Sequence, residues 1–311
     1  MGMSIKLKLL LWAFNKFESV DLEKISVKGL RKVADNRESR LMDGKPIPLP
    51  NVEDRDIRGR DGDIPIRIYT PEKAQGAPVI VFYHGGGFVI GNLKSHDKVC
   101  RRLCKMNQAF VVAVDYRLAP EHKFPAAVED CYDATKWVAE NISSWGGDPN
   151  KLIVMGDSAG GNLAAVTAIQ ARDLGTPKIA YQVLVYPTVD GRMQHPSINE
   201  NAEGYILTKE LMNWFMDNYA RTEADKSNPL MSPLLTEDLS NLPPALVQTA
   251  QFDPLRDEGI DYAKAIRAAG NEVKHTNYSG LIHTYFTMPK FNKECYSAHE
   301  EIAASIKAAV G

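Results

Sequence analysis

The chain has 311 residues, of which 44% are hydrophobic, so it can form a sizeable core in one large domain or two ordinary ones. Its formal net charge is −2, without the basic footprint that nucleic acids and anionic membrane surfaces attract, and we exclude both as expected partners. Chemistry on small molecules is the class of function that remains.

Residues 1 to about 42 contain two predicted helical stretches rich in Leu, Trp and Phe, which end at the breaker-rich segment 43–50. Lys6 and Lys8 precede the apolar run Leu9–Phe14, as at the start of a secretion signal. This run is too short, however, and no small-residue cleavage site follows it. We predict an amphipathic helix here, and nothing else in the sequence approaches the length of a membrane span.

From about residue 54 the hydrophobic pattern changes from helical to strand-like, with alternation over Ile64–Tyr69 and then a continuous apolar run over Val79–Tyr83. Strands that are apolar on both faces are typical of a parallel sheet with helices on both sides. The predicted fold class is therefore α/β, with a mostly parallel central sheet flanked by helices. Further strands are predicted at Phe110–Val114, Leu152–Met155, Val183–Tyr186, Ala245–Thr249 and Val273–Tyr278, and helices at Pro125–Asn141, Ala159–Leu174, Asp257–Ala269 and Lys293–Ala309.

The segment from about 190 to 230 interrupts this alternation of strands and helices. Within it, Thr208 is a suitable N-cap for a helix that carries large apolar side chains. An insertion between two strands is expected over the strand ends, and the N-terminal helices can join it. We therefore predict a single domain, residues 1–311, with a helical cap formed by about 1–42 plus about 190–230. Candidates for lining a pocket, with core packing as an equal alternative, are Leu207, Met212, Trp214 and Phe215.

Four cysteines follow no disulfide framework, and we interpret them as reduced thiols, which favours a cytoplasmic location. Cys100 and Cys104 are four residues apart on a predicted helix. No His or second Cys pair lies nearby, so two buried apolar side chains are a better interpretation than a shared metal. We expect neither a metal nor an organic cofactor.

Two glycine-rich motifs each follow a predicted strand. In Gly156–Gly161 (GDSAGG), the glycines allow Ser158 to stand at the tip of a sharp strand-to-helix turn, as a nucleophile requires. In His84–Gly87 (HGGG), consecutive glycines bring backbone N–H groups close to the oxyanion of a substrate. A plain tight turn explains only one or two of these glycines. The predicted nucleophile is Ser158, and the predicted oxyanion-hole donors are Gly86, Gly87 and Ala159.

Ser158 needs a base to accept its proton and an acid to hold that base in the right tautomer. Asp253 follows a strand late in the sheet, and His283 lies on the loop after the last predicted strand. The order Ser158, Asp253, His283 is that of α/β hydrolases. Asp190 also follows a strand and is an alternative acid, whereas Asp257 is more simply a carboxylate at a helix start.

The other histidines are less suitable as the base. His299 is expected on an exposed helix face, and His275 falls within a strand. His96, His122 and His195 are expected in loops or near helix ends.

Four sequence blocks, His84–Val89, Asp115–Ala127, Gly156–Asn162 and Asp253–Glu258, resemble the hormone-sensitive lipase family of microbial carboxylesterases in order and spacing. The resemblance extends from about residue 50 to the C-terminus. It implies an α/β-hydrolase fold with an N-terminal cap, and it suggests a homodimer. It also implies the triad Ser158, Asp253 and His283 and the oxyanion donors Gly86, Gly87 and Ala159.

Thr284 is the one departure from the family pattern, because the family usually has glycine directly after the catalytic histidine. A β-branched side chain at this turn is expected to narrow the pocket or to reshape the His283 loop. It affects substrate details rather than catalysis.

These observations predict a serine carboxylesterase that hydrolyses short- to medium-chain acyl esters of small molecules through an acyl-enzyme intermediate. One alternative is a non-catalytic protein that binds a small ligand, because the family scaffold resembles that of plant hormone receptors. Those receptors have lost the catalytic histidine, which this chain keeps as His283. Another alternative is an amidase, but peptidase relatives generally lack the HGGG loop.

Overall fold

A central eight-stranded sheet organises the computed structural model, which describes residues 2–17, 22, 24–41, 45–289 and 291–311. The strand order is β1-β2-β4-β3-β5-β6-β7-β8. β2 pairs antiparallel with both β1 and β4, and all other neighbours pair in parallel, so the predicted mostly parallel sheet is confirmed. The strands are β1 (Asn51–Gly59), β2 (Gly62–Thr70), β3 (Ala77–Tyr83), β4 (Phe110–Val114), β5 (Gly147–Asp157), β6 (Tyr181–Val185), β7 (Ala245–Phe252) and β8 (Val273–Ile282).

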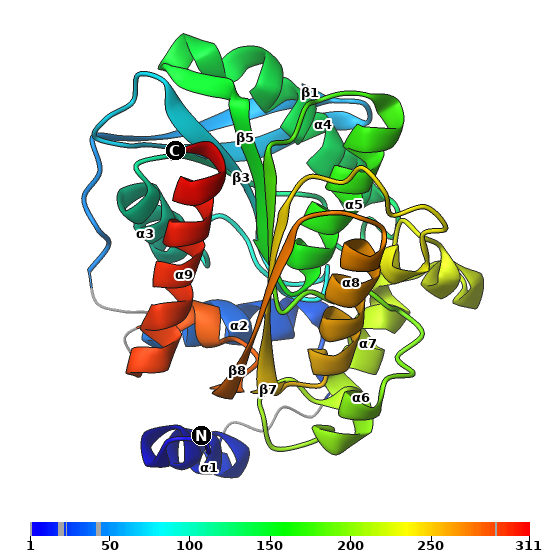
Figure 1. Ribbon diagram of the computed structural model, residues 1–311. Helices are drawn as coiled ribbons and strands as arrows, with labels where there is room; N and C mark the ends of the chain where they lie inside the picture. Colours follow the sequence, from blue (N-terminus) through cyan, green and yellow to red (C-terminus); the bar gives the residue numbers. More distant parts are fainter. Residues whose placement is uncertain (1, 18–21, 23, 42–44, 290) are drawn as a thin grey trace.

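Helices cover both faces of the sheet (Figure 1). α3 (Asp97–Asn107) and α9 (Lys293–Val310) lie on one face, and α4 (Ala126–Asn141), α5 (Ala159–Leu174) and α8 (Arg256–Ala268) lie on the other. Short 3₁₀ helices link these elements: η1 (Ile142–Trp145), η2 (Glu223–Ser227), η3 (Pro233–Leu235) and η4 (Tyr285–Thr287).

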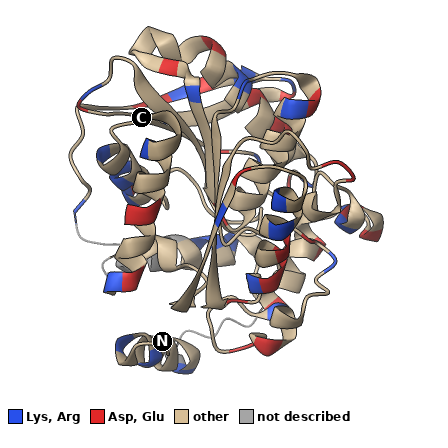
Figure 2. Ribbon diagram, in the orientation of Figure 1, with Lys and Arg blue, Asp and Glu red and all other residues tan. Residues whose placement is uncertain are grey.

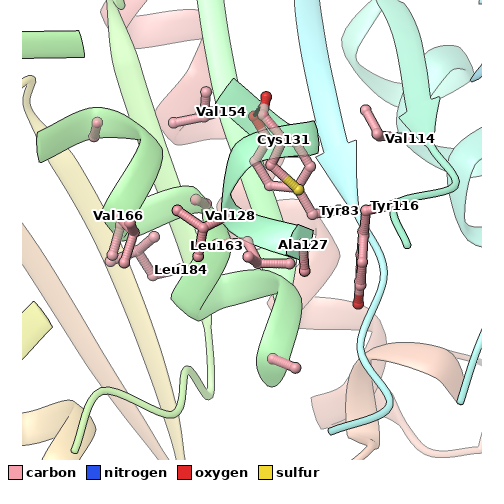
Figure 3. Close-up of a cluster of buried hydrophobic side chains, with 14 of the residues drawn as sticks. Tyr83, Val114, Tyr116, Ala127, Val128, Cys131, Val154, Leu163, Val166 and Leu184 are labelled. Atoms are coloured by element: carbon pink, nitrogen blue, oxygen red, sulfur yellow. Dashed lines mark hydrogen bonds between the residues drawn. The ribbon is translucent and has the colours of Figure 1, made fainter. Parts of the chain in front are cut away.

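The alternation of side chains in β3 explains why both faces need cover. Val81 and Tyr83 belong to the hydrophobic core beneath α4 and α5, whereas Ile80 and Phe82 belong to a separate core beneath α3 and α9. Successive side chains of a strand point to opposite faces, so a strand that is apolar at every position must be buried on both faces of the sheet. Figure 3 shows the first of these cores, with Tyr83 beside α4 and α5.

Four further helices lie near the carboxyl ends of the parallel strands (Figure 1) and are called the cap helices below: α1 (Ile5–Phe17), α2 (Val27–Leu41), α6 (Pro196–Glu200) and α7 (Lys209–Tyr219). Thr208 caps α7, with its hydroxyl accepting the Leu211 N–H at 3.1 Å, as the sequence predicts. Of the predicted N-terminal cap segment, residues 1, 18–21, 23 and 42 lie outside the described residues.

β1 is an element that the hydrophobic pattern did not predict. Its nine residues are mostly charged or polar, and Ile57 is its one buried side chain. The strand lies at the edge of the sheet and pairs only with β2, so most of its side chains face solvent. Edge strands of this kind carry no apolar period that a sequence reading can detect.

The four cysteines are free and buried, which agrees with the interpretation of Cys100 and Cys104 as buried apolar side chains. Cys100 and Cys104 belong to the core beneath α3 and α9, and burial raises the pKa of the Cys104 thiol to about 12. Figure 2 shows Lys and Arg interspersed with Asp and Glu on the outer helices, while the inner strands of the sheet carry few charges. Within the described ranges, no helix has the length and apolar character needed to cross a membrane.

Candidate active site

Ser158 joins β5 to α5 in a conformation that non-glycine residues seldom adopt, with φ 56° and ψ −119°. Glycines make this turn possible. A Cβ on Gly160 would overlap the carbonyl oxygen of Tyr83, and a Cβ on Gly156 would overlap the main chain of Gly160. The Ser158 N–H donates to the carbonyl oxygen of Val185 at 2.9 Å, which ties the turn to β6. Ser158 therefore lies at the tip of a sharp strand-to-helix turn at the carboxyl edge of the sheet.

His283 lies between Ser158 and Asp253 and contacts both. Its Nε2 is 3.0 Å from Ser158 Oγ, and its Nδ1 is 2.7 Å from Asp253 Oδ2. Asp253 directly follows β7 and His283 directly follows β8, and these two strands are neighbours in the sheet. Asp253 is fully buried, His283 is 4% exposed, and Asp253 Oδ1 also accepts the Leu255 N–H at 2.9 Å. The structure thus brings together the three residues that the sequence suggests as nucleophile, base and acid.

The alternative acids have other partners. Asp190 receives two hydrogen bonds from the Arg192 guanidinium, each at 2.8 Å. Asp257, at the start of α8, accepts the Ser197 N–H at 2.9 Å and pairs with Arg256 at 2.8 Å. Neither carboxylate is hydrogen-bonded to His283, so the geometry favours Asp253.

The expectation that His299 lies on an exposed helix face is wrong. His299 is 1% exposed, stacks on the Phe286 ring with centroids 4.6 Å apart, and contacts the Phe286 carbonyl oxygen through Nε2 at 2.9 Å. α9 packs along the sheet, so this polar residue occupies a buried position of the helix. Burial lowers the pKa of His299 to about 4, so its ring is neutral at pH 7.

The HGGG loop runs beside Ser158 in a conformation that requires glycine. Gly86 has φ 120° and Gly87 has φ 59°, both in the region where a side chain is strained. A Cβ on Gly86 would overlap the carbonyl oxygen of Ile90, and a Cβ on Gly87 would overlap the ring of Phe215. Both glycines border the same cavity as Ser158. Ala159 is the first residue of α5, where backbone N–H groups have no intrahelical partner.

Asp157 fixes this loop against the serine turn. Its Oδ1 accepts the Gly85 N–H at 3.0 Å and lies 3.4 Å from His96 Nε2. Burial raises the pKa of Asp157, but interactions with His96 and the Gly85 N–H outweigh burial, so the pKa lies below its usual value. Asp157 is therefore a buried carboxylate that links the two glycine motifs.

His84, the first residue of the HGGG motif, is a structural residue. The Tyr116 ring stacks on its imidazole with centroids 4.3 Å apart, and the Tyr116 hydroxyl donates to the His84 carbonyl oxygen at 2.6 Å. Burial lowers the pKa of His84 to about 3, so the ring is neutral. It supports the strand end from which the glycines extend.

Three neighbouring cavities lie around Ser158 and Phe215. The first, of about 140 Å³, is bordered by Ser158, His283 and the HGGG glycines, and the second, of about 520 Å³, extends from it between α1, α2 and the segment 203–211. The third, of about 30 Å³, is bordered by Ser158 and Gly87 but not by His283. Phe215 borders all three. Side chains from the cap helices therefore determine the space around the serine.

Sequence reasoning named some of the lining residues and missed others. Leu207, Met212 and Phe215 border the cavities described here, whereas Trp214 does not. Tyr186 was not singled out, although its ring lies 4.4 Å from the His283 imidazole. Other unassigned residues of the site include His96, Asp157, Ile206 and Leu211. Of these, only Asp157 had a sequence signal, because it lies within the serine motif.

Clustered His, Cys, Asp and Glu side chains can also bind a metal ion. In the part of the chain that the structure describes, no three His, Cys, Asp or Glu side chains are grouped so as to hold a metal ion.

Comparison with known proteins identifies the family. Residues 80–287 match a family described by its alpha/beta hydrolase fold. The chain is 44% identical to the carboxylesterase NlhH of Mycobacterium tuberculosis over 246 residues, which cover 77% of this chain and 76% of that protein. It is 37% identical to the ethyl acetate hydrolase of Pseudomonas putida over 263 residues, which cover 82% of each.

Solved structures agree with this result. A hyperthermophilic esterase from the archaeon Pyrobaculum calidifontis superposes with a TM-score of 0.94 and 45% identity, and the match covers 100% of both chains. The resemblance of the four sequence blocks and the strand order of the sheet agree with this assignment. The chain therefore belongs to the hormone-sensitive lipase family of carboxylic ester hydrolases, within the alpha/beta hydrolase fold.

Proposed function

We propose that this protein hydrolyses small esters of short- to medium-chain carboxylic acids, with Ser158 as nucleophile, His283 as general base and acid, and Asp253 as the orienting carboxylate. One observation carries the proposal: a single imidazole lies 3.0 Å from the serine Oγ through Nε2 and 2.7 Å from a buried carboxylate through Nδ1. This is the geometry that nucleophile, base and acid need in order to act together.

In the first half-reaction Ser158 Oγ attacks the ester carbonyl carbon while its proton passes to His283 Nε2. The carbonyl oxygen becomes an oxyanion, which accepts hydrogen bonds from the N–H groups of Gly86, Gly87 and Ala159. Asp253 accepts the Nδ1 proton of His283 in a hydrogen bond and stabilises the imidazolium. The bond from carbon to the alcohol oxygen then breaks, and the Nε2 proton goes to the leaving alcohol.

In the second half-reaction a water molecule attacks the acyl-enzyme ester. Its proton passes to His283 Nε2, and the same N–H groups stabilise the second oxyanion. The bond between the carbonyl carbon and Ser158 Oγ breaks, and Ser158 recovers its proton from His283. The carboxylic acid leaves, and the protein returns to its starting state. The chain's own side chains supply every proton transfer.

The size of the two cavities that Ser158 borders supports small substrates. The cavity at Ser158 and His283 has a volume of about 140 Å³, and the one that His283 does not border has only about 30 Å³. Because His283 must reach the leaving oxygen, the alcohol lies on its side, and the acyl group takes the opposite, smaller cavity. The name of the relative from Pseudomonas putida, ethyl acetate hydrolase, describes an ester of this kind.

The cap is part of the proposal. Residues of about 1–42 and 190–230 would form it on a single domain of 1–311, and side chains of α1, α2 and α7 border the cavities at the strand ends. We further propose that the protein is cytoplasmic, in keeping with its free, buried cysteines, and that it acts as a homodimer without a nucleic-acid partner.

The test is hydrolysis of a p-nitrophenyl ester series from acetate to palmitate by the unaltered protein, by Ser158→Ala and by His283→Ala. We expect turnover of the shorter esters and its loss in both variants, with circular dichroism and Tm as controls for folding. Turnover that survives in either variant would refute the assigned roles. Binding of small apolar ligands without any turnover would favour the non-catalytic alternative.

A further inference from the structure

Thr284 has an unusual backbone conformation directly beside the proposed catalytic histidine. Its φ is 75° and its ψ is 1°, in the left-handed region. A β-branched residue seldom adopts this region, because its side chain crowds the neighbouring main chain, whereas glycine adopts it without strain. Strained residues that persist at functional sites suggest that the side chain has a role there.

The local fold does not require the Thr284 side chain. Its carbonyl oxygen accepts the Thr287 N–H and the Thr287 hydroxyl, both at 3.0 Å, and any residue could provide these main-chain contacts. The Thr284 hydroxyl oxygen is itself buried and has no hydrogen-bond partner among the described residues. The strain is therefore not offset by a hydrogen bond of the side chain.

The position of Thr284 relates it to the substrate. It borders the cavity of about 140 Å³ together with Ser158, His283 and Thr287, and a glycine at this position would leave part of that space open. In the proposed reaction His283 Nε2 gives its proton to the leaving alcohol. The alcohol must therefore lie on the His283 side of Ser158, where Thr284 is found.

We propose that the volume of the Thr284 side chain limits the size of the alcohol part of the ester that this protein accepts. The inference rests on the proposed function and adds a specificity-determining residue to it. Thr284 touches no reacting atom in this account and acts by excluding branched alcohols. The acyl group lies in the small cavity bordered by Gly87 and Met216, away from Thr284, so its selection is independent of Thr284.

The test compares ethyl, isopropyl and tert-butyl acetates, which share one acyl group, in a pH-stat assay. For Thr284→Gly, we expect kcat/KM for the branched esters to rise by at least about tenfold relative to ethyl acetate, because a single methylene in a pocket already changes specificity by about that factor. Thr284→Ala should lie between glycine and threonine. Thr284→Val keeps the side-chain shape and removes the hydroxyl, and it should retain the selectivity of the unaltered protein.

Gln108→Gly is the matched control. Gln108 also has a left-handed backbone, with φ 47° and ψ 42°, but it follows α3 and does not border the cavities. Both glycine variants relieve the same kind of strain, so both should keep or raise the Tm. Only Thr284→Gly should change selectivity among alcohols, and neither should change the acyl-chain preference in the p-nitrophenyl series.

The outcomes separate this inference from the proposed function. An active enzyme whose alcohol selectivity is the same in Thr284→Gly overturns the role of Thr284 alone. A selectivity change in Thr284→Val equal to that in Thr284→Gly also overturns it, because the hydroxyl rather than the volume would be responsible. Failure of the unaltered protein to hydrolyse any ester would overturn both proposals.

Discussion

The sheet edge and the cap helices contribute to the site in different ways. At the sheet edge the conformation of the main chain sets the geometry of the site. Ser158 and Gly87 have positive φ angles, and side chains on the neighbouring glycines would overlap the backbone. The cap helices contribute side chains such as Leu211 and Phe215, which border the cavities without touching the triad hydrogen bonds. The main-chain geometry tolerates few substitutions, whereas apolar side chains can be replaced by slightly larger or smaller ones. Changes that disturb Ser158, its hydrogen-bonded partners or the glycine turns should therefore abolish chemistry, and changes in the cap should tune selectivity.

The largest expected effect at the sheet edge comes from Asp253→Asn. An amide cannot hold His283 in the tautomer that accepts the serine proton, so we expect kcat to fall by about 10⁴-fold with little change in KM. Steady-state kinetics on p-nitrophenyl butyrate measure it. The shape is preserved by the substitution, so the far-UV spectrum should stay the same.

Asp190→Asn and Asp257→Asn are the matched controls for this prediction. Both remove a carboxylate that follows a strand or starts a helix, and both leave the contact between Asp253 and His283 intact. We expect kcat to remain within about tenfold in each, as for residues outside the reacting unit. A loss in Asp190→Asn as large as in Asp253→Asn would show that the acid is wrongly assigned.

Gly87→Ala tests the point where the sheet edge meets the cap. Its new Cβ would overlap the Phe215 ring, and moving the loop would misplace a proposed oxyanion donor, the loss of which typically costs about 10²–10³-fold in kcat. Adding Phe215→Ala should restore part of the activity, because it removes the overlap. Gly76→Ala is the control for backbone strain alone, since Gly76 has φ 69° and open space around it, and it should keep its full kcat. Equal losses in the two glycine variants would refute the argument from overlap.

The same contrast explains what could be predicted from the sequence. Strand ends and glycine motifs leave local signals, so the order of Ser158, Asp253 and His283 along the chain was enough to suggest three residues that the fold brings within hydrogen-bond distance. The glycines of HGGG also left a local signal, and each occupies a position where a side chain does not fit. The parallel strands were predicted from their apolar runs for the same local reason.

Tertiary packing left no such signal. His299 looked exposed because the period of α9 does not reveal how the helix rests on the sheet, and β1 has no apolar alternation because it lies at the edge. Tyr186 contacts His283 only because two distant strands end at the same edge of the sheet. Which cap side chains border the cavities depends on the path of the 190–230 segment. That path cannot be worked out from helix propensity.

Glu258 allows a test of whether a buried charge affects stability where the sheet meets the 190–230 segment. It is fully buried in α8, and its Oε1 accepts the N–H groups of Val189 at 2.7 Å and Asp190 at 3.3 Å, where the 190–230 segment begins. Burial raises the pKa of Glu258 to about 8. Between its unfolded value of 4.5 and about 8, the folded state keeps a proton that the unfolded state releases, so stability falls as pH rises, by up to about 1.4 kcal/mol per pH unit.

Glu258→Gln should remove this pH dependence. We expect the variant and the unaltered protein to have similar unfolding free energies at pH 4. By pH 8 the unfolding free energy of the variant should exceed that of the unaltered protein by roughly 1–3 kcal/mol. Urea unfolding at several pH values measures the difference. Glu237→Gln, at an exposed position, should run parallel to the unaltered protein. If the stability difference between Glu258→Gln and the unaltered protein did not change with pH, the hydrogen bonds of residue 258, and not its charge, would be responsible.

The smallest effect is expected in the cap, from Phe215→Leu. Phe215 borders all three cavities, so a smaller side chain should connect the acyl cavity of about 30 Å³ to the larger space. We expect kcat/KM for hexanoate and octanoate esters to rise about tenfold relative to acetate, while kcat for acetate stays close to its original value. Phe110→Leu removes the same atoms from the buried core at the start of β4, so it should lower the Tm without altering chain-length preference. If Phe215→Leu instead lowered kcat equally for every ester, the cap would share in positioning the reacting groups, and the division between sheet edge and cap would not hold.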